Sequence, residues 1–209
     1  MRRAGSLVLA AALVGWNNAV LPRVWLSARH RALAGGAVGV ALTAVAATRC
    51  RSEELGISTG RIPEGFRVGI LASSVPAAAM LLAAAISGVR ARVRDGAPRE
   101  DFDEWVLLHI PVGTVLAEEL MFRSVLAAAL RSAWSPRQAI AIHAGAFGLW
   151  HVYPARAAGD NVLATVAFTA ASGVLFEALR ARSGSVVAPA LLHLTVNIGG
   201  VLLTRPELS

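Results

Sequence analysis

The chain contains no lysine, a single cysteine and few charged residues of either sign. All 20 basic residues are arginine, which excludes chemistry that needs a lysine amine, such as Schiff-base formation. Because Cys50 stands alone, an internal disulfide and a metal site built from cysteines are also excluded. Only 16% of the 209 residues are charged, whereas a soluble domain averages about 25%. The sequence therefore lacks the polar surface of a water-exposed globule of this size.

Apolar residues make up 56% of the chain, and they gather in long runs. A helix that crosses a bilayer needs about 20 mainly apolar residues, and runs near this length recur along the sequence. They predict seven helices, over residues 4–22, 32–48, 68–89, 105–130, 138–153, 161–179 and 183–204. We therefore expect an all-α fold, a polytopic transmembrane helical bundle of about seven spans.

The formal net charge of +7 does not indicate a nucleic-acid partner. The arginines stand singly or in pairs between apolar runs and form no basic stripe. This distribution is typical of loop charges and interfacial anchors, so we expect membrane lipid as the surrounding partner. The basic residues are all arginine and alanine is abundant, which favours a bacterial protein. Together with the apolar runs, this predicts a multi-pass protein of the bacterial cytoplasmic membrane. The arginines are nearly balanced between the two sides and leave the topology of the termini open.

Polar residues are distributed unevenly between the two halves of the chain. Residues 1–102 contain about three bland membrane helices followed by a charged loop, and nine of the fifteen residues from Arg90 to Glu104 are charged. This loop must lie in water. Residues 103–204, by contrast, carry acidic, imidazole and amide side chains within apolar helices. We expect the chemistry of the protein in this second segment.

The fourth predicted helix contains two acids and an arginine, Glu118, Glu119 and Arg123. Each charge inside a membrane helix costs about 2.5–3.5 kcal/mol, so the burial needs a partner or a function. Glu119 and Arg123 lie four residues apart on one helix face and can form an ion pair. An ion pair that merely orients helices would account for these two residues. It would leave Glu118 unexplained, and a free carboxylate can take a proton from water.

Two further helices carry histidines at helical spacing. His143, Phe147 and His151 are each four residues apart and line one stripe of the fifth helix. We interpret His143 as a packing residue, because a lone histidine in an apolar helix usually has that role. His193 and Asn197 share one face of the last helix, where they would either line a pocket or hydrogen-bond to a neighbouring helix.

If these groups converge, they supply a carboxylate base, an imidazole that positions water, and neutral donors for an oxyanion. That set hydrolyses an amide without a nucleophilic side chain. A zinc site built from Glu118, His151 and His193 is an alternative, since nitrogen and carboxylate ligands suit zinc. Buried acids and histidines also form proton relays in transporters.

Three short motifs occur in order: E-E-x-x-x-R at 118–123, F-x-x-x-H at 147–151 and H-x-x-x-N at 193–197. Together, over about residues 103 to 200, they resemble the CPBP intramembrane proteases, which include CAAX prenyl endopeptidases and bacteriocin-processing or immunity proteins. The resemblance implies that Glu118 activates water with His151, and that His193 and Asn197 form an oxyanion hole. It also implies residues that order the site, namely Glu119, Arg123 and Phe147.

The prediction is thus an intramembrane endopeptidase with its catalytic core in the four C-terminal helices, of a glutamic rather than a metallo type and without a cofactor. Its substrate would be a membrane-associated peptide, either prenylated at a CAAX-like terminus or of the bacteriocin type. The alternatives are a non-catalytic immunity or scaffold protein of the membrane and a proton-coupled transporter. The sequence predicts neither the substrate's identity nor an oligomeric state.

Overall fold

The structure is a computed structural model that describes residues 3–89 and 99–205. The described residues form helices and connecting turns, with no strand among them. The α-helices are α1 (Arg3–Gly15), α2 (Ala28–Ala47), α3 (Ser52–Leu55), α4 (Ile62–Ala85), α6 (Phe102–Glu104), α7 (Ala127–Arg131), α8 (Pro136–Trp150), α9 (Val152–Ala158), α10 (Val162–Ser183) and α11 (Val187–Thr204). Wider π-helical turns form η1 (Trp16–Val20), η4 (Trp105–Leu116) and η5 (Glu119–Leu126). Residues 90–98 of the charged loop predicted from Arg90 to Glu104 lie outside the described residues.

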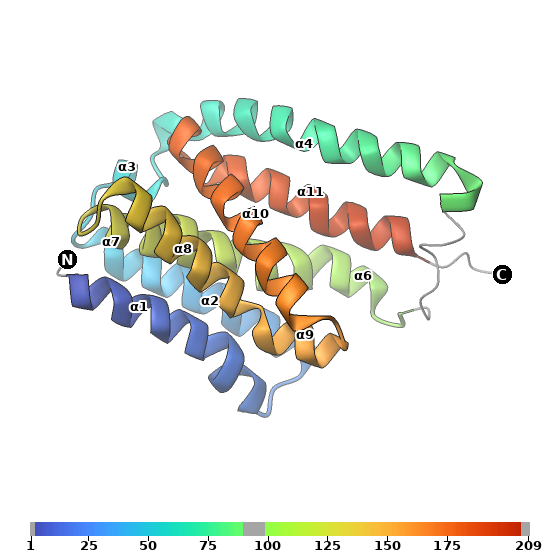
Figure 1. Cartoon of the computed structure of the whole chain (residues 1–209), viewed down its shortest axis with the longest axis horizontal. Helices are drawn as coiled ribbons and strands as arrows, with labels where there is room; N and C mark the ends of the chain where they lie inside the picture. The colour runs from blue at the N-terminus through green and yellow to red at the C-terminus, as the bar shows by residue number, and fades with distance from the viewer. Residues whose placement is uncertain (1–2, 90–98, 206–209) are drawn as a thin grey trace.

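The helices pack around the one that carries the two acids. Helix α1 packs on α8, α8 on α10, α10 on α11 and α11 on α4, while α2 lies against η4 and η5 (Figure 1). In the most apolar 18 residues of the helical stretch Phe102–Arg131, 50% of the residues are buried. The corresponding share in the other long helices is 11–28%. The acids of this stretch are therefore enclosed by protein rather than by lipid.

Within the described residues, six helical stretches are long and apolar enough to cross a membrane: Arg3–Arg23, Ala28–Ala47, Thr59–Ala85, Phe102–Arg131, Val162–Ser183 and Val187–Thr204. The prediction of an all-α polytopic membrane bundle is confirmed. The fifth predicted helix is present as α8, but its 15 residues extend only about 22 Å. This is shorter than the hydrocarbon core of about 30 Å. Helix α8 therefore lies within the bundle without the length of a full span.

The acid-bearing stretch differs from the predicted α-helix, because η4 and η5 are π-helical. Pro111 lies inside η4. It has no N–H to donate, and its ring clashes with the carbonyl of Leu107 four residues earlier, so the regular α-helical ladder cannot continue there. Short π-helical stretches occur often at functional sites.

Small residues let α2 approach the acid-bearing stretch closely. A Cβ atom added to Gly113 would lie 2.7 Å from Ala32 Cβ and 2.8 Å from Ala32 Cα. On α2, Gly35, Gly36 and Gly39 are buried, and an added Cβ on each would meet the same stretch. The backbones thus pack with no room for a side chain between them, as is common where helices associate in lipid.

We expect the substitution Gly113→Ala to destabilise the folded protein by about 1–3 kcal/mol, because the new methyl group must push α2 away. Thermal unfolding in detergent would measure the effect. Gly145→Ala is the matched control, since nothing lies within 4 Å of a Cβ at that position. The control should unfold at the same temperature as the parent or slightly higher. Equal melting temperatures for the two variants would contradict the close approach.

Candidate active site

Glu118 lies between η4 and η5 in the chain. One of the two oxygens of its carboxylate is fixed by a hydrogen bond. Glu118 Oε1 accepts a hydrogen bond of 2.9 Å from the indole nitrogen of Trp150 on α8. The second oxygen, Oε2, is buried and accepts no hydrogen bond from the part of the chain that the structure describes. One oxygen is therefore fixed, and the other is available to a bound molecule.

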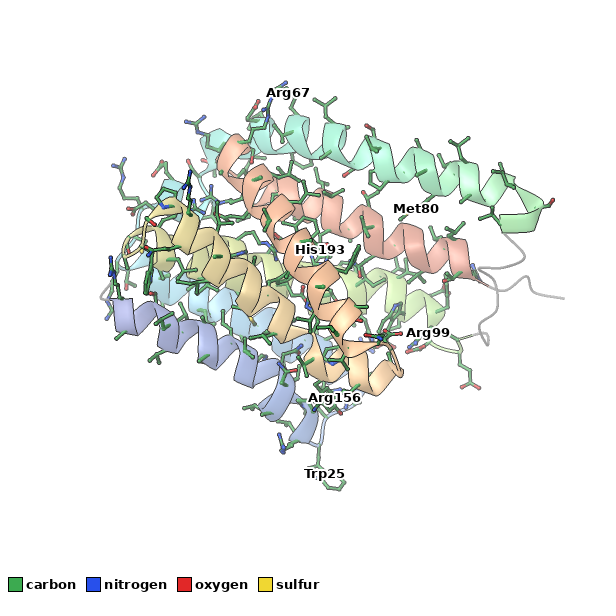
Figure 2. All side chains as sticks on the ribbon, in the orientation of Figure 1. Trp25, Arg67, Met80, Arg99, Arg156 and His193 are labelled. Carbon is green, nitrogen blue, oxygen red and sulfur yellow. The ribbon has the colours of Figure 1, made fainter. Side chains whose placement is uncertain are left out.

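Two imidazole rings face this second oxygen. The Nε2 atom of His151 lies 4.0 Å from Glu118 Oε2, and the Nε2 atom of His193 lies 3.9 Å from it. Figure 2 shows His193 in the middle of the bundle, whereas Trp25 and Arg67 project from its outer surface. These separations are too long for direct hydrogen bonds, but a water oxygen about 2.8 Å from each atom would bridge such a gap.

The partners of the other ring nitrogens fix how both histidines are protonated. His151 Nδ1 lies 2.8 Å from the carbonyl oxygen of Phe147, which can only accept, so Nδ1 carries the proton. His193 Nδ1 lies 2.9 Å from Glu119 Oε1, and an ionised carboxylate likewise only accepts. In their neutral forms both rings therefore present the lone pair of Nε2 toward Glu118. Three acceptors around one point favour a donor such as water between them.

Glu119 links the arginine of its own helix to the histidine of α11. Arg123 is wholly buried, and its Nη1 atom lies 3.4 Å from Glu119 Oε1, the same oxygen that bonds to His193. The ion pair predicted from the four-residue spacing is thus present. One carboxylate balances a buried cation and orients a ring that faces Glu118.

Aromatic rings surround the remainder of the Arg123 guanidinium. Its central carbon lies 3.9 Å from the ring centre of Phe147 and 4.8 Å from that of Phe176. Ring faces attract a cation, which offsets part of the cost of burying this one. Phe147 also packs edge-on against His151, with ring centres 4.9 Å apart. Phe176 stacks on His193 at 5.0 Å. The two phenylalanines thus connect the buried cation to both histidines.

Asn197 lies on α11 one turn after His193, but its amide turns back along its own helix. Its Nδ2 atom donates to the His193 carbonyl at 3.0 Å. No hydrogen bond joins Asn197 to Glu118 or His151 among the described residues. The structure thus brings together six of the seven motif positions and leaves the Asn197 amide beside them.

The sequence analysis did not identify Trp150 or Phe176. Trp150 directly precedes His151 and lies within the F-x-x-x-H motif, so its place in the motif could have indicated a role in the site. Phe176 carried no signal that distinguishes it from an ordinary core residue. His143 agrees with its interpretation as a packing residue, since it is buried with Nε2 3.3 Å from the Phe122 carbonyl.

The three atoms that the zinc alternative requires lie together, but at wider spacing than the ligands of a formed zinc site. Neighbouring ligands of a tetrahedral zinc ion with bonds of about 2.0 Å lie about 3.3 Å apart. The two separations from Glu118 Oε2 are wider, at 3.9 and 4.0 Å. No group of three or more His, Cys, Asp or Glu side chains suited to a metal ion occurs within residues 3–89 and 99–205.

Residues 101–199 match the family of type II CAAX prenyl endopeptidase Rce1-like proteins. This stretch covers 99 of the 209 residues and contains all three motifs. No curated protein and no solved structure matches the chain. The family supports a CAAX-type membrane protease in general, in agreement with the described helices that are long and apolar enough to cross a membrane.

We expect Trp150→Phe to lower kcat/KM about 10- to 100-fold, because a hydrogen bond to a carboxylate contributes about 1.5–3 kcal/mol. The ring stays in place, but Glu118 Oε1 loses its donor. Peptide cleavage by purified protein would measure the change. Trp134→Phe is the matched control, since the Trp134 indole bonds to Ser6 away from the site. A Trp150→Phe variant as active as the control would show that this bond does not matter.

Proposed function

We propose that the protein is an intramembrane endopeptidase of the glutamate type, in which Glu118 activates the attacking water. One observation carries the proposal: a buried carboxylate oxygen that accepts no hydrogen bond from the described residues is faced by two imidazole nitrogens at 3.9 and 4.0 Å. The catalytic core would comprise residues 103–204, and residues 1–102 would supply membrane helices that support it.

In the proposed reaction, Glu118 Oε2 removes a proton from water as the water oxygen attacks the carbonyl carbon of the peptide bond. His151 Nε2 accepts a hydrogen bond from the second O–H of this water and so orients its oxygen. The carbonyl oxygen becomes an oxyanion while the C–N bond is still intact. Glu118 then passes its proton to the nitrogen as that bond breaks, which yields an amine and a carboxylic acid, and the acid releases its remaining proton to water. Trp150 holds the Glu118 carboxylate in place through both steps.

The oxyanion needs donors, and α11 offers two. A proton on His193 Nε2 would make that nitrogen a donor, and the Glu119 carboxylate at Nδ1 offsets the resulting positive charge. Asn197 would become the second donor after its side chain rotates away from the His193 carbonyl. Donors aimed at a developing negative charge lower the barrier most in a site that excludes water.

The proposed substrate is a peptide held at the membrane, with an isoprenylated CAAX-type terminus as the first candidate, because the family match supports it. Unprenylated membrane-anchored and bacteriocin-type peptides are the other candidates. An apolar bundle gives a lipid-modified peptide access from the bilayer without exposure of the lipid chain to water.

The test is cleavage of a farnesylated peptide that ends in Cys-aliphatic-aliphatic-X, with release of the terminal tripeptide measured by mass spectrometry. Glu118→Gln should lower kcat about 10²- to 10⁴-fold, the range for loss of a general base. Glu64→Gln is the matched control, since Glu64 pairs with Arg67 at the surface of α4. Cleavage by Glu118→Gln at the parent rate would refute the mechanism. The same peptide without the lipid tests whether prenylation is required.

Metal removal separates the glutamate mechanism from the zinc alternative. We expect the parent protein to retain its activity after extensive treatment with a chelator, because water is activated by Glu118 and needs no metal. Elemental analysis of the treated protein checks that removal is complete. Loss of activity on chelation with recovery on added zinc would establish the metal mechanism instead.

A further inference from the structure

The helix that carries Trp150 and His151 is interrupted at His151. Helix α8 ends at Trp150 and α9 begins at Val152, and His151 between them has φ −91° and ψ 5°, outside the helical range. Pro154 follows four residues after Trp150 and has no N–H, so the Trp150 carbonyl cannot receive its usual helical hydrogen bond. The carbonyl of Trp150, whose side chain contacts Glu118, therefore needs a hydrogen-bond donor from outside its own helix.

Two adjacent asparagines of η1 supply the missing partners from the other end of the chain. Asn17 Nδ2 donates to the Trp150 carbonyl at 2.9 Å. Asn18 Nδ2 donates to the Leu149 carbonyl at 2.9 Å, and Asn18 Oδ1 accepts from the Tyr153 N–H at 2.6 Å. In an unbroken helix the Tyr153 N–H would bond to the Leu149 carbonyl directly. The amide of Asn18 is inserted between these two groups.

These three hydrogen bonds form an asparagine clamp, made by Asn17 and Asn18 on residues 149–153. The clamp holds the backbone on both sides of His151, whose ring faces Glu118 Oε2. It also holds the backbone of Trp150, whose indole bonds to Glu118 Oε1. Both protein contacts that fix Glu118 relative to α8 thus pass through the clamped segment.

A local role for the asparagines does not explain the contacts. Asn18 also donates to the Val14 carbonyl of its own helix at 2.8 Å, but the three partners on residues 149–153 lie more than 130 residues away in sequence. Both asparagines lie outside the segment that matches the Rce1-like family. Each is a half-buried polar side chain at the end of an otherwise apolar run, where an unpaired amide costs free energy. The bonds satisfy the asparagines and the interrupted helix together.

We propose that Asn17 and Asn18 are positioning residues that fix His151 and Trp150 against Glu118. This inference rests on the proposed function, because it assigns the asparagines a role through the proposed catalytic histidine. A displacement of about 1 Å in a catalytic group can lower the rate about 100-fold. Loss of the clamp therefore acts on kcat rather than on substrate binding.

The test compares the double variant N17A/N18A with the parent protein by two measurements. The first is NMR of protein labelled at histidine, with the His151 signals assigned by their absence in His151→Gln. The second is kcat and KM for the farnesylated peptide. We expect the His151 signals to shift, while those of His30 and His109 stay unchanged. We expect kcat to fall about 10- to 100-fold, with KM within about threefold of the parent.

Asn161→Ala is the matched control, because Asn161 uses its side chain only to cap α10 through the Ala164 N–H. It should change neither the His151 signals nor kcat. If the double variant does not fold, the single variants Asn17→Ala and Asn18→Ala each keep one anchor and should show smaller shifts in the same direction. Folded variants with the parent's His151 signals would overturn the proposal.

The two measurements separate this proposal from the proposed function. If Glu118→Gln cleaves the peptide as fast as the parent, or if the parent does not cleave it, the protease mechanism fails. The NMR signals of His151 still decide the clamp, because they need no substrate. If Glu118→Gln is inactive while N17A/N18A has parental kcat and parental His151 signals, the clamp alone is wrong.

Discussion

The interior of this bundle depends on the contacts that the Glu119 carboxylate makes with Arg123 and His193. Arg123 is wholly enclosed by protein, and an isolated buried cation is strongly destabilising. Glu119 lies beside it on the same helix, and one carboxylate oxygen serves both Arg123 and His193. Since α11 carries His193, this oxygen also fixes the register between the acid-bearing stretch and the last helix.

Two neighbouring acids take different roles because they project from the helix in different directions. Glu119 is directed toward Arg123 and α11, and its Oε1 atom contacts both Arg123 and His193. Glu118, one residue earlier, is directed toward α8, where one oxygen is held by Trp150 and the other, within the described part of the chain, accepts no hydrogen bond but faces two imidazole rings. Pairs of titratable groups in such contrasting environments are typical of acid–base catalysis. The ion pair therefore organises a site in which a different carboxylate can react.

The sequence predicted the parts of this arrangement that follow from local spacing. The pairing of Glu119 with Arg123 follows from four-residue spacing, and the convergence of Glu118, His151 and His193 follows from the cost of isolated polar groups in apolar helices. Their convergence could be expected without knowledge of which helices touch, because each group needed a partner.

Other features of the site depend on how the helices cross, and the spacing of residues along the sequence gives no information on that. The bond from Trp150 to Glu118 requires a particular rotation of α8 against a stretch that is π-helical rather than α-helical. Phe176 is an ordinary apolar residue in sequence, and its contact with Arg123 arises only from the packing of α10. The shortness of α8 follows from the break at His151, which an apolar run of residues conceals.

The N-terminal half of the chain is mostly apolar and the C-terminal half carries the polar groups, but the two halves pack together and depend on each other structurally. Helix α2 packs against η4 and η5 through buried glycines, so the position of the acids depends on a helix that carries no charge over its apolar run. The amides that replace missing hydrogen bonds around His151 also come from the first 20 residues. A site built on three C-terminal helices thus takes its rigidity from helices that lack catalytic groups. Catalysis by positioned groups needs this rigidity, because the proposed water must lie within about 3 Å of a carboxylate and an imidazole at once.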